Sequence, residues 1–380
     1  MIKKLLNLFN YFKNILYDII KLLYFFIKLY YMKIYIIFFL FIFLLIYISR
    51  YKKEKMSAEI NKNNVNIDIR KLEKNNQIIY PKRIKLKELH FKNIIKKNYK
   101  SNREVLENII NPFSGYVISD YFLGTEVFDK DIDINLNNKK NLNNITNYEI
   151  IKENSIIMCQ VNKLKFFVLK ILPKLNNKII LITGQWHLDQ VRKSDLTDKI
   201  INSNKIIRWF SQNPLYEYEK IDKYHGFPYG IKHSSCLAYY NFLISNNKSP
   251  KKKNLVQLYC GIHKHLPSNN IRKIYPQICN FPKKKYNDYL LELNQSKFII
   301  STSGDRDDCY RHYEAIGLNT IPISDIGFLY KEIFGDNMLY FDIPSIININ
   351  KNGKINHIYK ETNRDLITTE YWKEWILNHK

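Results

Sequence analysis

The sequence predicts an α/β fold with two lobes, preceded by an N-terminal transmembrane helix. Three observations support this fold class. A buried strand, a polar loop, a helix and a second buried strand follow one another at 297–325, and a similar order occurs at 155–184. A basic linker at 248–253 separates these two patterns. The third observation is an uncharged apolar run at 34–49. Strands that alternate with helices along a chain are typical of parallel sheets.

The first element of the chain is this apolar run. Arg50, Lys52, Lys53 and Lys55 follow it. At about 1.5 Å per residue, a helix over about 33–49 comes close to the thickness of a bilayer core. A buried soluble helix fits less well because the run has no polar face. A cleaved signal peptide also fits less well, since no small-residue cleavage site follows the run. We therefore expect residues 1–50 to be a single-pass membrane anchor.

The segment after the anchor, 51–100, is polar and rich in Lys and Asn. It shows no clear periodicity, and we interpret it as a basic stem. The chain has a formal net charge of +25, and much of this excess lies within residues 1–100. Basic residues beside a membrane can bind anionic lipid. A nucleic-acid partner is not expected, because the stem has few aromatic residues to stack on bases.

Residues 101–247 are expected to form the first lobe. A helix in this lobe is predicted from apolar residues at a spacing that gives one buried stripe, namely Leu164, Phe167, Val168 and Ile171. The elements predicted for the lobe are a turn at 111–115, strands at 116–119, 155–160, 178–184 and 205–210, and this helix at 163–174.

Three polar residues of the first lobe are candidates for acid–base chemistry. His187 and Asp189 follow the strand at 178–184, and His225 lies in a Gly- and Pro-containing loop at 224–231. Ligands of open parallel sheets bind beyond the carboxyl ends of the strands. A His or a carboxylate with a pKa near neutrality can take a proton from a hydroxyl group. The alternative is that each of the three is a structural hydrogen-bonding residue.

A D-x-D triplet, Asp131 and Asp133, also lies in the first lobe. Two such carboxylates can hold a divalent cation. The surrounding Lys and Asn residues favour a solvated turn, so we expect no metal site there.

Residues 254–350 are expected to form the second lobe, and residues 351–380 a helical tail. Arg272, near the start of a predicted helix, is a possible phosphate ligand or an ordinary surface residue. The predicted strands lie at 254–259, 298–301, 320–324 and 338–342, and the predicted helices at 268–278, 286–293, 310–318, 328–334 and 365–377.

The helix at 310–318 carries Arg311 and Glu314 on one face, because residues three apart are neighbours on a helix. This geometry suits a nucleotide diphosphate. The guanidinium group and the amides of the first turn can hold the phosphates, and a carboxylate one turn later can accept hydrogen bonds from ribose. The alternative is an exposed helical ion pair, which contributes only a few tenths of a kcal/mol.

The residues around this helix resemble a known family signature. Gly304, an acidic loop, the run from Arg311 through Glu314 to Ala315, Gly317 and the strand at 321–325 are similar to the C-terminal signature of the exostosin family of glycosyltransferases. The close match covers about thirty residues, 297–325, and a looser match extends over about 154–375. The resemblance implies a GT-B-like architecture, with two Rossmann-type lobes and a cleft between them. It also implies that the tail packs back onto the first lobe.

The resemblance implies transfer of a sugar from a nucleotide diphosphate sugar to a glycan or glycoprotein acceptor. Glu314 would contact the ribose, and Arg311 would lie near the diphosphate. With Ser303, Gly304 and Asp305, Arg311 would support the leaving group without an obligatory cofactor or metal. The family also implies a lumenal, type II arrangement in the Golgi or endoplasmic reticulum, whereas the positive charge after the anchor favours a cytosolic body.

Two other functions remain open from the sequence. One is a non-catalytic, membrane-tethered binding protein that retains the fold. The other is a metal-dependent transferase that uses Asp131 and Asp133. The donor sugar, the acceptor, the linkage and the oligomeric state have no signal in the sequence.

Overall fold

We analysed a computed structural model of the chain. The structure describes residues 88–379, except 125–133, 135–138, 185–190, 213–220, 247–251, 259–283 and 305. All of the described residues belong to one compact unit, Arg83–Lys380. The predicted transmembrane helix at about 33–49 lies outside them.

The first sheet has six parallel strands in the order β2-β1-β3-β4-β5-β6. Alternate residues of its central strands belong to different cores: Ile180 and Ile182 point to one face, and Ile179 and Leu181 to the other. Both faces are covered, which explains the continuous apolar runs in the sequence. The strands are β1 Tyr121–Leu123, β2 Lys140–Asn141, β3 Ile156–Gln160, β4 Ile179–Gly184, β5 Ile206–Gln212 and β6 Tyr224–Phe227.

Helical segments pack on both faces of this sheet. On one face lie α7 (Asp195–Asn202) and an irregular helical run from Val161 to Lys174, which comprises η3, α6, η4 and η5. Ser194 caps α7 by accepting a hydrogen bond from the amide of Thr197, which satisfies one of the open donors of the first turn. On the other face lies α5, Ser114–Ile118.

The second sheet has four parallel strands in the order β10-β9-β8-β7. Within β8, Ile299 belongs to the core that faces the first sheet, and Phe298 and Ile300 pack on the other side with residues of α13. The strands are β7 Lys253–Leu258, β8 Ser296–Ile300, β9 Ile321–Ser324 and β10 Leu339–Tyr340. The helices are α10 Tyr286–Gln295, α11 Tyr310–Gly317, α12 Phe328–Phe334 and α13 Ile343–Asn352.

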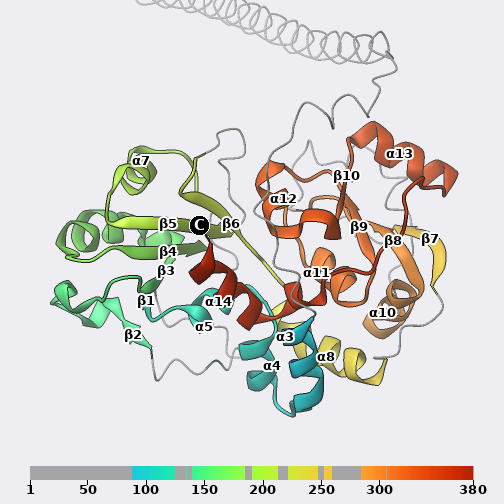
Figure 1. Cartoon of the computed structure of the whole chain (residues 1–380), viewed down its shortest axis with the longest axis horizontal. Helices are drawn as coiled ribbons and strands as arrows, with labels where there is room; N and C mark the ends of the chain where they lie inside the picture. The colour runs from blue at the N-terminus through green and yellow to red at the C-terminus, as the bar shows by residue number, and fades with distance from the viewer. Residues whose placement is uncertain are drawn as a thin grey trace, which may run out of the picture. The chain divides into compact units, whose positions relative to one another are not determined.

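Helices from both ends of the compact unit, together with α8 between the two sheets in sequence, join the two sheets. Trp375, on the tail helix, packs against Phe210 of β5, and Arg208 donates a hydrogen bond to the carbonyl of Ile376. The tail therefore lies against the first sheet, as Figure 1 shows. The joining elements are α3 Leu89–Lys97, α4 Asn102–Asn108, α8 Cys236–Ser245, η9 Arg364–Ile367 and α14 Thr369–Asn378.

The structure confirms an α/β fold with parallel strands, but the predicted GT-B-like fold class is wrong. The two sheets are unequal, with six and four strands, and β10 has only two residues. One continuous hydrophobic cluster includes Ile182 of the first sheet and Ile299 of the second. Apolar side chains of the described residues therefore connect the two sheets through one continuous core.

The transmembrane part of that fold class is also not found in the part of the chain that the structure describes. None of the helices there combines the length and the apolar character that a membrane span needs. The longest, such as α8, α10 and α14, have ten residues. At about 1.5 Å per residue, ten residues reach only half of the ~30 Å hydrocarbon core.

Three local predictions also differ from the structure. The strand predicted at 116–119 is the end of helix α5, and the loop predicted at 224–231 begins with strand β6. Residues 89–97, which were assigned to the stem, form α3. Tertiary contacts explain the difference at α3, because His90, Phe91 and Ile94 are buried although the segment is rich in Lys.

Candidate functional site

The loop between β8 and α11 lies at the carboxyl end of a parallel strand, which is the usual ligand position in open sheets. Strand β8 ends at Ile300, and α11 begins at Tyr310. Cys309 is the N-cap residue, with extended backbone angles of φ −141° and ψ 157°. The sequence prediction of a strand, a polar loop and a helix at this place is confirmed.

The loop is fixed to the neighbouring strand by Ser303. Its amide donates to Oδ1 of Asp325 at 2.9 Å, and its hydroxyl donates to Oδ2 at 3.3 Å. Asp325 directly follows β9. The amide of Gly304 donates to the carbonyl of Arg306 at 2.8 Å and closes a tight turn. Contacts of Ser303 with a diphosphate would therefore require it to exchange its bonds to Asp325.

The side chain of Asp308 is buried inside the protein. Its Oδ2 accepts hydrogen bonds from the amide of Tyr229 at 2.9 Å and from the hydroxyl of Tyr313 at 2.5 Å. The ring of Tyr229 also stacks on Tyr310, with centroids 5.1 Å apart. These contacts connect the segment after β6 to the first turns of α11. The carboxylate of Asp308 is thus hydrogen-bonded within the fold and does not point toward a ligand.

His312 lies behind this loop and is completely buried. Its Nδ1 is 3.2 Å from Oδ1 of Asp308, and its Nε2 is 2.9 Å from the carbonyl oxygen of Ser301. Nδ1 also lies 3.4 Å from the amide nitrogen of Cys309, so this ring nitrogen faces both a carboxylate and an N–H group. Burial lowers the pKa of His312, but the nearby Cys309 sulfur and the Asp308 carboxylate outweigh this effect and raise the pKa to about 10.

Arg311 lies in the first turn of α11 and is partly buried. Its Nη2 is 3.9 Å from the sulfur of Cys309, which is a weak acceptor. Its Nε is buried and has no hydrogen-bond partner among the described residues. A buried donor without an acceptor costs about 1–3 kcal/mol. An arginine kept in this state at a helix N-terminus is suited to bind an anion.

Glu314 follows one turn later on the same helix and is only 5% exposed. Its two carboxylate oxygens accept hydrogen bonds from the hydroxyls of Tyr286 and Tyr289, at 2.8 and 2.9 Å. Burial raises the pKa of Glu314, and the two tyrosine bonds act in the opposite direction. Each oxygen still has a second lone pair, so the carboxylate can accept further hydrogen bonds.

The two tyrosines were missed in the sequence analysis. They lie three residues apart on α10, at positions that share one helix face. That spacing was visible in the sequence, but nothing indicated that the face would meet Glu314.

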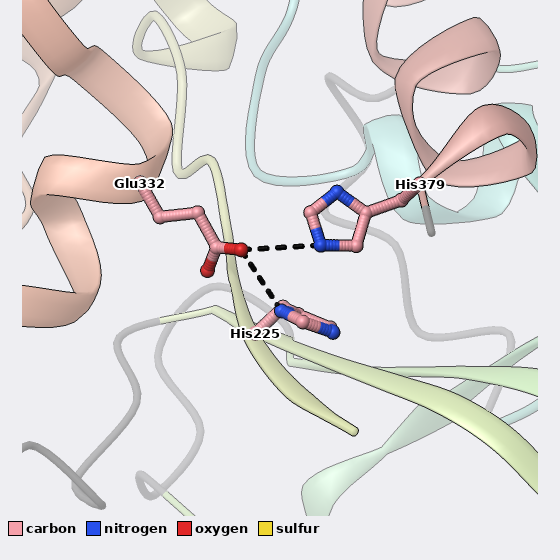
Figure 2. A group of neighbouring side chains, drawn as sticks. All are labelled: His225, Glu332 and His379. Carbon is pink, nitrogen blue, oxygen red and sulfur yellow. Dashed lines mark hydrogen bonds and ion pairs between the residues drawn. The ribbon is translucent and has the colours of Figure 1, made fainter. Parts of the chain in front are cut away.

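His225, a predicted acid–base residue, lies on β6 and is nearly buried. Its Nδ1 is 3.0 Å from Oε1 of Glu332, and the same oxygen is 3.1 Å from Nε2 of His379 (Figure 2). The contacts found for His225 are with this pair and with the ring of Phe210. None of these contacts of His225 is with Arg311 or Glu314.

The remaining predicted site residues lie outside the described part of the chain. They are His187, Asp189, Arg272, Asp305, Asp131 and Asp133. Their roles stay predictions.

Comparison with protein-family models and with curated proteins found no relative of this chain. No protein-family model matches the chain, and no curated protein matches it. The resemblance to the exostosin family thus rests on the residues of the β8–α11–β9 segment alone.

Proposed function

We propose that the protein is a glycosyltransferase that moves a sugar from a nucleotide diphosphate sugar to a hydroxyl group of a glycan or glycoprotein. The observation that carries this proposal is the buried Nε of Arg311 at the start of α11, which has no hydrogen-bond partner among the described residues. It is combined with a carboxylate, Glu314, one turn later on the same helix.

The diphosphate accounts for the position of Arg311. A phosphate oxygen would supply the acceptor that Nε lacks, and a guanidinium group can bind phosphate with two parallel hydrogen bonds. The partial positive charge at the N-terminus of α11 acts in the same direction. Asp308 does not oppose this binding, because its carboxylate is neutralised by Tyr229, Tyr313 and His312.

The nucleoside accounts for Glu314. The carboxylate oxygens each use one lone pair on a tyrosine hydroxyl, and the second lone pairs can accept the two ribose hydroxyls. Tyr286 and Tyr289 hold the carboxylate in one orientation, so little conformational entropy is lost on binding.

The reaction follows from these contacts. The bond between the anomeric carbon and the diphosphate oxygen breaks, and the acceptor oxygen forms the new bond. Arg311 stabilises the charge that develops on the leaving diphosphate, which is the type of electrostatic stabilisation that contributes most to such reactions. A base takes the acceptor proton. His187 and Asp189, which follow β4 in the sequence, are our candidates for that base.

The first test is isothermal titration of the full-length chain with UDP, GDP and pyrophosphate. We expect saturable binding of one nucleotide. Arg311→Ala should weaken both the nucleotide and pyrophosphate at least about tenfold, since one charge-assisted phosphate contact contributes roughly 1.5–3 kcal/mol. Glu314→Gln should weaken the nucleotide but leave pyrophosphate unchanged.

A matched control is Arg103→Ala, because Arg103 forms a surface ion pair with Glu107 on α4. It should bind as the unmodified protein does. Absence of nucleotide and pyrophosphate binding by the folded, unmodified chain would refute the proposal. Nucleotide binding without sugar transfer to any acceptor would favour the non-catalytic binding protein.

A further inference from the structure

Two histidines and a glutamate come together at a second place in the fold, shown in Figure 2. His225 lies on β6, Glu332 on α12, and His379 directly follows α14. One potential ligand atom from each residue lies within 4.8 Å of the other two. In the part of the chain that the structure describes, no other group of three such residues meets this condition.

The surroundings of the cluster are apolar and aromatic. The imidazole of His379 lies 4.4 Å from the ring of Trp375, and the imidazole of His225 lies 5.2 Å from the ring of Phe210. The histidine side chains are 11% and 6% exposed, and that of Glu332 is 23% exposed. A small opening therefore remains on the side of the carboxylate.

We propose that His225, Glu332 and His379 form a binding site for a divalent transition-metal ion, with Zn²⁺ as the best-fitting ion. Two imidazoles and one carboxylate are a common zinc ligand set, with Nδ1 or Nε2 bound directly to the metal.

The distances agree with this assignment. Ligands that bind zinc at about 2.0–2.1 Å in a tetrahedron are about 3.3 Å from one another. The separations of Oε1 of Glu332 from the two histidine nitrogens are 3.0 and 3.1 Å. The ligand atoms of the two histidines also lie within 4.8 Å of each other.

A hydrogen-bonded cluster without a metal is the alternative arrangement. Both histidines are directed at the same carboxylate oxygen, Oε1. Each must then carry a proton on the nitrogen that faces Glu332. A divalent ion replaces both protons and binds all three residues through lone pairs, which is the usual state of histidines in such a set.

The ion would connect three elements that are far apart in the sequence, β6, α12 and α14. Three protein ligands leave a fourth position for water or for a substrate group. Coordination through Nδ1 would also prevent His225 from acting as a general base through that nitrogen. This inference does not depend on the proposed glycosyltransferase activity, since it concerns other residues.

The test is titration of ZnCl₂ into the full-length, chelator-treated chain, followed by calorimetry and by the thermal unfolding temperature. We expect one Zn²⁺ per chain and a higher unfolding temperature, whereas MgCl₂ should have neither effect. CoCl₂ should give the visible absorption bands of a four- or five-coordinate Co²⁺ site, and ZnCl₂ should abolish them.

Two variants locate the ion. Glu332→Gln keeps the shape of the side chain, and His379→Ala removes a ligand; each should weaken Zn²⁺ binding at least about tenfold. His90→Ala is the matched control, because His90 forms a 3.0 Å pair with Glu374 but meets no third ligand among the described residues. Lack of Zn²⁺ and Co²⁺ binding by the unmodified chain would overturn the proposal. So would unchanged affinity in Glu332→Gln, which also decides the matter if His379→Ala does not fold.

Discussion

Asp308 receives hydrogen bonds from two parts of the chain, the segment after β6 and helix α11. Its carboxylate is 1% exposed, so its charge is stable only because these donors and His312 compensate it. The group keeps α11 in place and thereby positions Arg311 and Glu314. Asp308 thus acts by positioning the helix.

The buried pair of Asp308 and His312 predicts how stability depends on pH. The unfolded chain releases the histidine proton near pH 6.5, whereas the folded protein keeps it to about pH 10. The folded state therefore binds more protons between these values, and its stability falls as pH rises. The contribution is complete below about pH 6.5 and is lost at about pH 10.

The measurement is the free energy of unfolding from urea titrations between pH 6 and 10, for the unmodified protein and for His312→Gln. We expect the difference between the two proteins to shrink steadily as pH rises. A difference that stays constant over this range would show that His312 is not protonated in the folded state.

At the scale of elements, the strands that the sequence predicts best are those buried on both faces. Strands β3, β4, β5 and β8 were predicted correctly because a continuous apolar, β-branched run indicates a buried strand even when its neighbours in the fold are unknown. Helix α8 was missed, since apolar residues occur all around it and hide the helical spacing of its buried residues Cys236, Tyr239, Tyr240 and Leu243.

Lys252 joins several elements of the second sheet. Its ammonium group donates to the carbonyls of Asn294, Ser296 and Leu318, at 2.9, 3.2 and 2.6 Å. These carbonyls lie at the end of α10, the start of β8 and the end of α11. The residue comes from a Lys-rich segment, and the sequence analysis placed it in a linker.

Lys252→Met should lower the free energy of unfolding by roughly 2–3 kcal/mol, because buried carbonyl groups lose a charged donor. Lys199→Met, at an exposed position of α7, is the control and should change it by less than about 0.5 kcal/mol. Urea denaturation gives both values. Equal values for the two variants would show that the Lys252 bonds do not contribute to stability.

At the scale of the whole compact unit, the contacts that decide the arrangement join residues far apart in the chain. Glu88 and Arg364 form two hydrogen bonds, at 3.0 and 2.8 Å, and His225 meets Glu332 and His379. No local pattern predicts such pairs. The sequence thus predicted α11 with Arg311 and Glu314, but not the partners of Glu314, the continuous core between the sheets or the histidine cluster.

The junction behind strand β6 gives a prediction at this scale. The amide of Ile231 donates to the carbonyl of Ile110, and the amide of Ile110 donates to the carbonyl of Ile367. Gly230 has φ +81°, and a Cβ atom there would lie 2.4 Å from the carbonyl of Ile110. The N-terminal segment, the first sheet and the tail can meet at these distances only because residue 230 has no side chain.

Gly230→Ala should therefore lower the free energy of unfolding by roughly 2–5 kcal/mol, the sum of about 1–2 kcal/mol for the left-handed backbone and about 1–3 kcal/mol for the clash. Gly353→Ala separates the two effects. Gly353 also has a positive φ, +60°, but a Cβ atom there has nothing within 4 Å, so this variant should lose only the backbone part. Urea denaturation of the two variants measures the clash as their difference. If they were equally stable, the junction would be able to open without cost, and the close approach at Ile110 would not be what holds the three segments together.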